Sequence, residues 1–280
     1  MTVAVACNLS EGVVLGVDSA VTLSDQEGNI SKVFENAEKL FQLGDSPIGV
    51  AVYGLASLGE RSLGSYLREF EIRDPDSVLK TPSSLKEVTE SLRKFLFAAH
   101  GTAFPQPSQV EELPPEKRPW FGLVIAGFSP GQYLSEVWEI QIPQHATPDS
   151  SVRRKGPGEL GSDWFAMYQP ILRYLKGFDP VLIDTLISYI TPKLAKPLSA
   201  TELDEAGRLL QRFEYQTMYK AMPMEEGVRF VRFLVELVIN HHRFTVGAPV
   251  VGGKARLGMV TYKGEKFQLL DLDRRERSPR

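Results

Sequence analysis

The chain of 280 residues has very little cysteine, no early basic residue and no long apolar run. Its single cysteine, Cys7, excludes a framework of internal disulfides and is typical of a reducing compartment. No lysine or arginine precedes Lys32, so the first residues do not have the basic segment that begins a secretory signal peptide. No uninterrupted apolar run reaches the roughly 20 residues that cross a bilayer. We therefore expect a cytoplasmic protein that contacts no membrane.

Neither sign of charge dominates the sequence. The 32 basic and 35 acidic residues give a net charge of −3, and no basic stripe is visible. Proteins that bind nucleic acid normally carry such a stripe, so we expect no nucleic-acid partner. Hydrophobic residues make up 42% of the chain, which is enough to bury a substantial core. A core of this size fits one large domain or two small ones, and no internal repeat is visible. Our prediction is a single domain over residues 1–280.

Two adjacent histidines, His241 and His242, invite a metal-binding interpretation. Neighbouring residues of a helix point to different faces, and no carboxylate or cysteine is spaced to complete a ligand set. We therefore interpret both as ordinary residues at the end of a helix. No metal ion or other cofactor is expected.

Apolar periodicity predicts strands and helices in a mixed order. The expected strands cover residues 3–8, 13–17, 39–43, 48–53, 120–127, 133–142, 257–262 and 266–270. The expected helices cover residues 55–70, 84–100, 162–176, 180–190, 199–218 and 224–240. We expect loops at residues 24–29, 102–119 and 143–158, and a frayed charged tail at 271–280. This order predicts an α+β fold in which two stacked antiparallel sheets have helices outside them.

The first predicted strand starts directly after Thr2. A threonine hydroxyl is a poor nucleophile until a neighbouring base takes its proton, and the α-amino group of the same residue is one recognised base. That amine has an ordinary pKa of about 7.7–8.0, against about 10.4 for lysine, so part of it is neutral at physiological pH. This chemistry requires that Met1 be removed. The small side chain of Thr2 is suited to an ordinary methionine aminopeptidase.

Four segments of the first third of the chain occur in the order found in one enzyme superfamily. They are Thr2 at the start of a strand, GVVLGVDS at residues 12–19, KLFQL at 39–43 and IGVAVYG at 48–54. In this pattern the chain resembles the β-type subunits of the proteasome, the HslV-type peptidases and the Anbu group, which are N-terminal-nucleophile hydrolases. The resemblance implies a four-layer αββα sandwich.

The resemblance also implies a catalytic role for each of four residues. Thr2 would be the nucleophile, Asp18 and Lys39 would tune it, and the Gly54 N–H would stabilise the oxyanion. Each of these residues also has an ordinary structural interpretation. Asp18 could end a strand in a turn, Lys39 could be a solvated charge and Gly54 could precede a helix. Lys32 is a second candidate for the lysine, although Lys39 has the better strand context.

The sequence departs from the superfamily pattern in three places. In the run from Gly158 to Ser162, Leu160 takes the expected place of a serine near the nucleophile, and Ser162 looks like a helix N-cap. The segment 241–253 has neither the aspartate nor the serine expected before its Gly-Gly pair. Residues 178–222 look like an added helical insertion.

The resemblance implies a threonine-type peptidase that acts on unfolded polypeptides or peptides, and subunits that assemble into a homo-oligomeric ring or a related array. A partner ATPase is only conjecture. Two alternatives stay open at this point. The chain could be a non-peptidase amidase of the same superfamily that acts on small amides, or a catalytically silent assembly protein with the proteasome fold.

Overall fold

The computed structural model describes residues 2–24, 30–81, 83–114, 117–143, 151–194, 199–247, 249–264 and 266–270. The chain divides into two compact units, of which the first comprises Met1–Met167 with Tyr219–Arg280 and the second Tyr168–Met218. The helical insertion expected at 178–222 overlaps the second unit. The expected frayed tail at 271–280 lies outside the described residues. Within the described residues, no helix combines the length and apolar character that crossing a bilayer requires.

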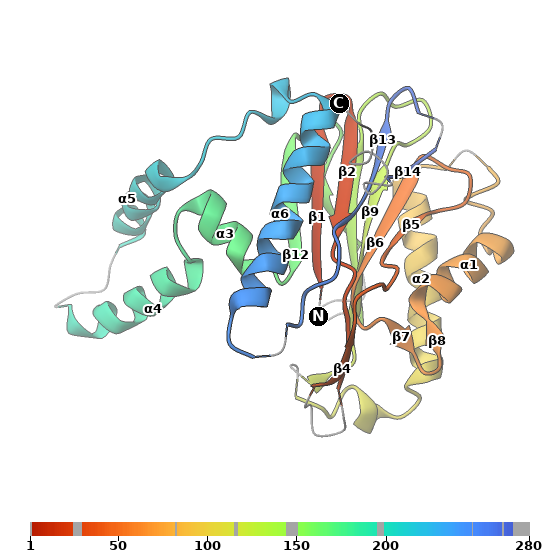
Figure 1. The fold of residues 1–280 in the computed structure, drawn as a ribbon, viewed down its shortest axis with the longest axis horizontal. Helices are drawn as coiled ribbons and strands as arrows, with labels where there is room; N and C mark the ends of the chain where they lie inside the picture. Colours follow the sequence, from red (N-terminus) through yellow and green to blue (C-terminus); the bar gives the residue numbers. More distant parts are fainter. Residues whose placement is uncertain are drawn as a thin grey trace. The chain divides into compact units, whose positions relative to one another are not determined.

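Two five-stranded antiparallel sheets form the centre of the first unit (Figure 1). The strands of the first sheet, in spatial order, are β12 (Gly161–Ala166), β1 (Val3–Leu9), β2 (Gly12–Val17), β13 (Arg256–Thr261) and β14 (Gln268–Leu270). The strands of the second sheet are β11 (Ser151–Lys155), β10 (Glu136–Ile142), β9 (Phe121–Gly127), β6 (Ile48–Gly54) and β5 (Leu40–Gln42). Every residue of β1, β2 and β9 is buried, because both faces of the sheets are covered.

The two sheets pack face to face through small and β-branched side chains. Leu15 and Val17 of the first sheet share one buried cluster with Val124 and Val137 of the second sheet. Phe267 closes one side of this cluster, where the absence of Cβ atoms at glycines of β6 and β13 makes room for its ring. Burial of each such side chain contributes about 1.5–3 kcal/mol, so this interface is a major source of stability.

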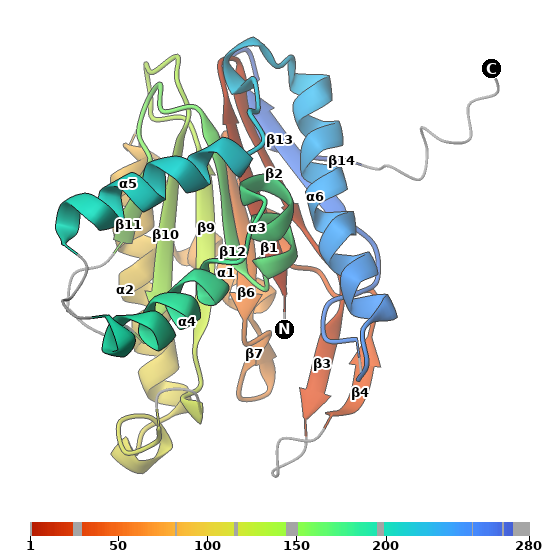
Figure 2. The same cartoon turned by 90° about the vertical axis from the view of Figure 1, so that its left-hand side faces the viewer.

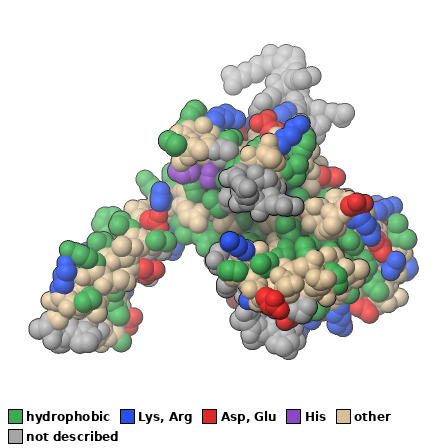
Figure 3. All heavy atoms as spheres, turned by 90° about the horizontal axis from the view of Figure 1, so that it is seen from below, with side chains coloured by type: hydrophobic (Ala, Val, Ile, Leu, Met, Phe, Trp, Pro, Cys, Tyr) green, Lys and Arg blue, Asp and Glu red, His purple; other side chains and the backbone are tan. Residues whose placement is uncertain are grey.

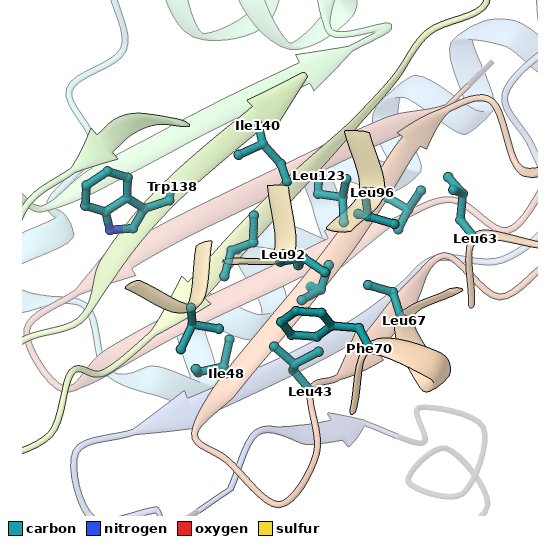
Figure 4. Packing of buried hydrophobic residues seen from close by; sticks show 14 of the residues in the cluster. Leu43, Ile48, Leu63, Leu67, Phe70, Leu92, Leu96, Leu123, Trp138 and Ile140 are labelled. Carbon is teal, nitrogen blue, oxygen red and sulfur yellow. The ribbon is translucent and has the colours of Figure 1, made fainter. Parts of the chain in front are cut away.

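Helices α1 (Leu63–Arg73) and α2 (Leu85–Ala103) cover the outer face of the second sheet. Figure 4 shows Phe70 of α1 close to Leu92 of α2 and to side chains of the sheet. Ser84 begins α2 with a capping box, in which its hydroxyl accepts the Glu87 N–H while the Glu87 carboxylate accepts the Ser84 N–H. The helix expected at 84–100 is therefore present, and the capping box defines where it begins.

Helix α6 (Met224–Phe244) covers the outer face of the first sheet, on the side away from α1 and α2 (Figures 1 and 2). Helix α6 approaches the first sheet closely because glycines lie where the two are in contact. A Cβ atom on Gly16 of β2 would lie 2.5 Å from Val231, and one on Gly227 of α6 would lie 2.3 Å from Leu9. The mixed α+β class with antiparallel sheets, expected from the sequence, is confirmed.

Several local predictions are wrong. The paired strands β3 (Val21–Ser24) and β4 (Ile30–Phe34) were not expected. Of the loop expected at 24–29, Ser24 ends β3 and residues 25–29 lie outside the described residues. The start of the helix expected at 55–70 is instead the small hairpin β7 (Ser57–Leu58) and β8 (Arg61–Ser62). The segment from Gly161 to Ala166 is a strand, so Ser162 is no helix cap. Of the loop expected at 143–158, residues 144–150 lie outside the described residues, and Ser151–Lys155 form β11 of the second sheet.

The second unit contains helices and short 3-10 turns. They are α3 (Gln169–Lys176), α4 (Pro180–Ile190), η3 (Thr191–Lys193), α5 (Ala200–Leu210) and η4 (Gln211–Phe213). Ion pairs join Arg173 to Asp179 at 2.6 Å and Lys176 to Glu214 at 2.7 Å. The helix expected at 199–218 therefore ends early, because the chain turns at η4 and residue 215 bonds back to α3.

Candidate active site

Thr2 lies at the start of β1 and is almost fully buried, with 2% of its surface exposed. Its carbonyl accepts a hydrogen bond from the Met167 N–H at 3.0 Å, which ties the start of the chain to the end of β12. Ala166, the residue before Met167, has a positive φ of 62°, a conformation that a non-glycine residue rarely adopts. Residues 166–167 therefore lie beside Thr2, a placement that the sequence analysis missed.

Asp18 follows the end of β2 and is completely buried. Backbone N–H groups donate to both of its oxygens: Val3 to Oδ1 at 3.1 Å, and Ala20 and Gly252 to Oδ2 at 3.1 and 3.2 Å. A carboxylate that accepts several backbone N–H groups is held in one orientation. The turn interpretation of Asp18 accounts only for the Ala20 contact, because Gly252 lies 234 residues away.

Lys39 brings Thr2 and Asp18 together. It precedes β5, is 5% exposed, and donates from Nζ to Thr2 Oγ1 and to Asp18 Oδ1, both at 2.9 Å. Burial lowers the pKa of Lys39, and the Asp18 charge opposes this shift. Lys32, the other candidate, is exposed on β4, where its ammonium lies 4.8 Å from the centre of the Phe34 ring. The structure therefore brings together Thr2, Asp18 and Lys39 but not Lys32.

This geometry has a direct chemical meaning. An ammonium that donates to a hydroxyl oxygen stabilises the negative charge that develops when the hydroxyl loses its proton. In a buried site this effect is larger than in water, because little solvent competes for the charge. The same ammonium is held by the carboxylate of Asp18 at 2.9 Å. The three side chains thus form a preorganised environment for an activated hydroxyl.

Gly54 ends β6 and lies on the same cavity as Thr2 and Lys39. Its φ of +86° is in the left-handed region, and a Cβ there would lie 2.8 Å from the carbonyl oxygen of Trp120. Only glycine fits this backbone without strain. A glycine before a helix does not explain this restriction, because the next helix begins only at Leu63.

The cavity has a volume of about 960 Å³, within the range of small-molecule and peptide sites. Its lining includes Thr22 and Phe34 from the β3–β4 hairpin, Phe41 from β5 and Leu67 from α1. Figure 3 views the molecule from below and shows many hydrophobic side chains at the surface of this face. The cavity thus has largely apolar walls, and Thr2 and Lys39 are among its lining residues.

A buried polar pair lies just before Gly54. The Tyr53 hydroxyl donates to Oε1 of Glu139, which also accepts from Gln141 Nε2 at 3.0 Å, and Arg154 lies 3.3 Å from the second oxygen of Glu139. Burial and the Glu139 charge raise the pKa of Tyr53. The phenol therefore stays neutral and links the end of β6 to β10.

The loop before β13 takes part in the site through its backbone. Besides the Gly252 N–H on Asp18, the Lys254 N–H donates to Ser19 Oγ at 2.8 Å. Gly253 between them has a φ of +70°, and a Cβ there would lie 2.3 Å from the carbonyl oxygen of Glu35. The segment that lacks the aspartate and the serine of the superfamily pattern thus contacts Asp18 through a backbone N–H group.

The run from Gly158 to Ser162 is not beside Thr2. In the register of β1 with β12, Gly161 pairs with Asn8 and Ala166 pairs with Val3, so Gly161 lies at the far end of β1. Leu160 therefore does not occupy a position next to the nucleophile, and this prediction is corrected. The Ser162 hydroxyl instead lies 2.7 Å from the Tyr219 hydroxyl.

The remaining candidates for chemistry lie elsewhere. Cys7 is completely buried, and burial, with a smaller contribution from Asp163, raises its pKa to about 12, as expected of a core thiol. His241 and His242 lie in the last turn of α6. Among the described residues, no group of three or more histidine, cysteine or acidic side chains is placed to hold a metal ion. Met1, whose removal the chemistry requires, lies outside the described residues.

Comparison with known proteins finds matches among solved structures, whereas the sequence comparisons find none. No protein-family model matches the chain, and no curated protein sequence matches it. Among solved structures, it is similar to the Anbu (Gly-1) mutant from Hyphomicrobium sp. strain MC1, with a TM-score of 0.55 and 10% identity. The similarity covers 98% of this chain and 88% of that chain. The chain therefore shares its fold with this Anbu structure.

Proposed function

We propose that the chain is a threonine-type peptidase in which Thr2, freed by removal of Met1, is the nucleophile. The observation that carries this proposal is the position of Lys39 Nζ, 2.9 Å from both Thr2 Oγ1 and Asp18 Oδ1 in a buried site. A structural ion pair alone would not require a hydroxyl at the ammonium. The apolar cavity beside Thr2, with Gly54 in its lining, supports the same proposal.

The proposed reaction has two steps. First, the freed α-amine of Thr2 takes the hydroxyl proton, and Oγ1 attacks the carbonyl carbon of the scissile amide. The oxygen of the tetrahedral intermediate is stabilised by the Gly54 N–H, and Lys39 stabilises the attacking oxygen. The C–N bond then breaks, and the leaving amine takes the proton from the α-ammonium. In the second step the α-amine deprotonates a water molecule, which hydrolyses the ester and restores the Thr2 hydroxyl.

We also propose the finer architecture and assembly that accompany this activity in the superfamily. The packing of α1 and α2 on one sheet, of the two sheets on each other and of α6 on the other sheet supports a four-layer αββα sandwich. A homo-oligomeric ring or related array in the cytoplasm would restrict substrates to unfolded polypeptides and peptides. Sedimentation of the purified chain measures this assembly directly.

The test begins with the intact mass of the purified protein, which reports whether Met1 is present. A peptide epoxyketone reacts with the hydroxyl and free amine of one residue, so it should label the processed protein once. Thr2→Ala should abolish labelling and hydrolysis of casein without unfolding the protein. Thr22→Ala, which changes another threonine in the lining of the same cavity, should leave labelling in place.

Three other outcomes of these experiments would change the proposal. Labelling that persists in Thr2→Ala would refute the assignment of the nucleophile. Complete retention of Met1 in the native protein would favour a silent assembly protein instead. Hydrolysis of acylated amino acids, with no cleavage of casein, would replace the peptidase by an amidase that uses the same Thr2 chemistry.

A further inference from the structure

One buried aromatic side chain contacts both of the backbone segments that carry the proposed chemistry. Tyr53 lies in β6, directly before Gly54, and is buried. Its ring packs edge-on against Trp120 and stacks on Phe165, with 5.8 Å between the ring centres in each case. Gly122 of β9 makes room for this ring, because a Cβ atom there would lie 2.2 Å from Tyr53 Cζ. The ring therefore has a fixed place in the cluster between the two sheets.

The contact with Trp120 leads to the backbone of Gly54. The Trp120 carbonyl oxygen accepts a hydrogen bond from the Leu55 N–H at 3.0 Å, and Gly54 pairs with Phe121 in the register of β6 with β9. A Cβ atom on Gly54 would lie 2.8 Å from the same carbonyl oxygen. The residues on both sides of Gly54 are therefore tied to Trp120, one through the ring of Tyr53 and one through a main-chain hydrogen bond.

The contact with Phe165 leads to Thr2. Phe165 lies in β12, two residues before Met167, whose N–H donates to the Thr2 carbonyl oxygen at 3.0 Å. The ring of Tyr53 therefore contacts the segment that holds the proposed nucleophile as well as the segment that carries the proposed oxyanion donor.

The hydroxyl of Tyr53 is fixed by its own partners. It donates to Glu139 Oε1, and Gln141 Nε2 lies 3.4 Å from the phenol oxygen. Arg154 Nε lies 3.3 Å from Glu139 Oε2, and the same guanidinium lies 5.4 Å from the centre of the Phe165 ring. Tyr53 is among the lining residues of the larger cavity, but its hydroxyl cannot turn toward a substrate without losing these hydrogen bonds.

We propose that Tyr53, anchored by Glu139, is a positioning residue that sets the place of the Gly54 N–H relative to Thr2. The inference rests on the proposed peptidase activity, in which that N–H stabilises the oxyanion. Such a donor must lie within hydrogen-bonding distance of the oxygen that becomes charged, and a displacement of about 1 Å can lower the rate about 10²-fold. The stabilisation is gained in the transition state, so its loss lowers kcat and leaves KM nearly unchanged.

Hydrolysis of fluorescein-labelled casein by the full chain, purified with Met1 removed, tests the proposal. Tyr53→Phe keeps the ring and removes the hydroxyl, so kcat should fall about tenfold or more while KM stays within about twofold of the parent. Tyr219→Phe is the matched control. It removes a phenol that lies 2.7 Å from Ser162 Oγ, in the part of β12 that pairs with the far end of β1, and should leave kcat within about twofold.

Two substitutions of Glu139 test the anchor from its other side. Glu139→Leu removes the acceptor and keeps the phenol, so it should lower kcat to an extent similar to Tyr53→Phe. Arg154, which loses its partner in this variant, is partly exposed and can be solvated. Glu139→Gln keeps an oxygen that accepts from the Tyr53 hydroxyl, so its kcat should stay within about threefold of the parent.

Two further measurements separate displacement of the donor from loss of the fold or of the nucleophile. Circular dichroism and the Tm of each variant show whether kcat is measured on folded protein. The peptide epoxyketone should still label Tyr53→Phe once at completion, because Thr2 and its hydrogen bond from Lys39 are left in place.

The outcomes that overturn the inference are distinct from those that overturn the proposed function. Parental kcat in folded Tyr53→Phe overturns the positioning role and leaves the peptidase in place. A rise in KM at unchanged kcat also overturns it, because Tyr53 would then bind substrate. So does a loss of kcat in Tyr219→Phe or Glu139→Gln as large as that in Tyr53→Phe. A processed parent that neither cleaves casein nor reacts with the epoxyketone overturns the proposed function, and the positioning role falls with it.

Discussion

Replacement of Asp18 by asparagine should destabilise the protein strongly, and the structure gives the reason. The carboxylate is fully buried and accepts from the Val3, Ala20 and Gly252 N–H groups as well as from Lys39 Nζ. The NH₂ group of asparagine is itself a donor and would face a group that also donates. The Lys39 ammonium would lose its counter-charge. Removal of one partner of a buried ion pair costs about 3–5 kcal/mol. At about 2–4 °C per kcal/mol, Tm should fall by roughly 6 °C or more.

A double-mutant cycle separates the Asp18–Lys39 interaction from other effects of the substitutions. Lys39→Met keeps the length of the side chain and removes its charge, so it should also cost about 3–5 kcal/mol by stranding Asp18. The double variant Asp18→Asn/Lys39→Met buries no unpaired charge. Its loss in free energy of unfolding should therefore be smaller than the sum of the two single losses by about 1.5 kcal/mol or more.

The assay is urea unfolding followed by circular dichroism, with the slope of each transition compared among variants. Lys32→Met is the matched control, because this exposed lysine on β4 should change stability by no more than about 0.5 kcal/mol. If the two single losses add to within about 0.5 kcal/mol in the double variant, Asp18 and Lys39 do not interact as described. Asp18 would then not hold the Lys39 ammonium in place beside Thr2, and the site would not be preorganised.

Three further outcomes follow from the same geometry. Because burial lowers the pKa of Lys39 and its ammonium is required, hydrolysis should fall as pH rises through a value below the ordinary lysine pKa of about 10.4. A pH–rate profile with its alkaline limb at or above that value would contradict this. Gly54→Ala, at φ +86°, should lower kcat/KM about 10²-fold or more by displacing the oxyanion donor. Gly253→Ala should lower Tm, because its Cβ would lie 2.3 Å from the Glu35 carbonyl oxygen, whereas the Cβ of Gly252→Ala would meet its nearest neighbour at 3.6 Å and should be tolerated. Equal Tm values for these last two variants would show that the loop is not constrained.

The sequence predicted the elements whose apolar pattern is strong. Strands β1, β2 and β9 are buried throughout and β6 is buried up to Gly54, and continuous β-branched runs near glycines marked all four clearly. Strands β3 and β4 were missed because the sequence between them is polar and most of β4 is exposed. Strand β11 was missed for a similar reason, since its sequence SVRRK carries three basic residues and no apolar alternation. Exposed edge strands lack the pattern on which such predictions depend.

The candidate site was predictable only in part. Thr2, Asp18 and Lys39 were named from the resemblance of their strand-end segments to one enzyme superfamily, and in the structure Lys39 lies within hydrogen-bonding distance of both Thr2 and Asp18. The contact from Gly252 to Asp18 spans 234 residues and uses a backbone N–H, which no residue type reveals. The pairing of Tyr53 with Glu139 across 86 residues was likewise invisible, because each residue alone reads as part of a strand.

The support of Asp18 by main-chain groups explains how this site can form without the side chains expected in segments 158–162 and 241–253. A hydrogen bond from a backbone N–H depends on the path of the chain, so the sequence of the loop can change while the donor stays in place. That path is fixed at Gly253, whose positive φ and close contact with Glu35 leave no room for a side chain. In this chain the loop therefore acts on Asp18 through its conformation.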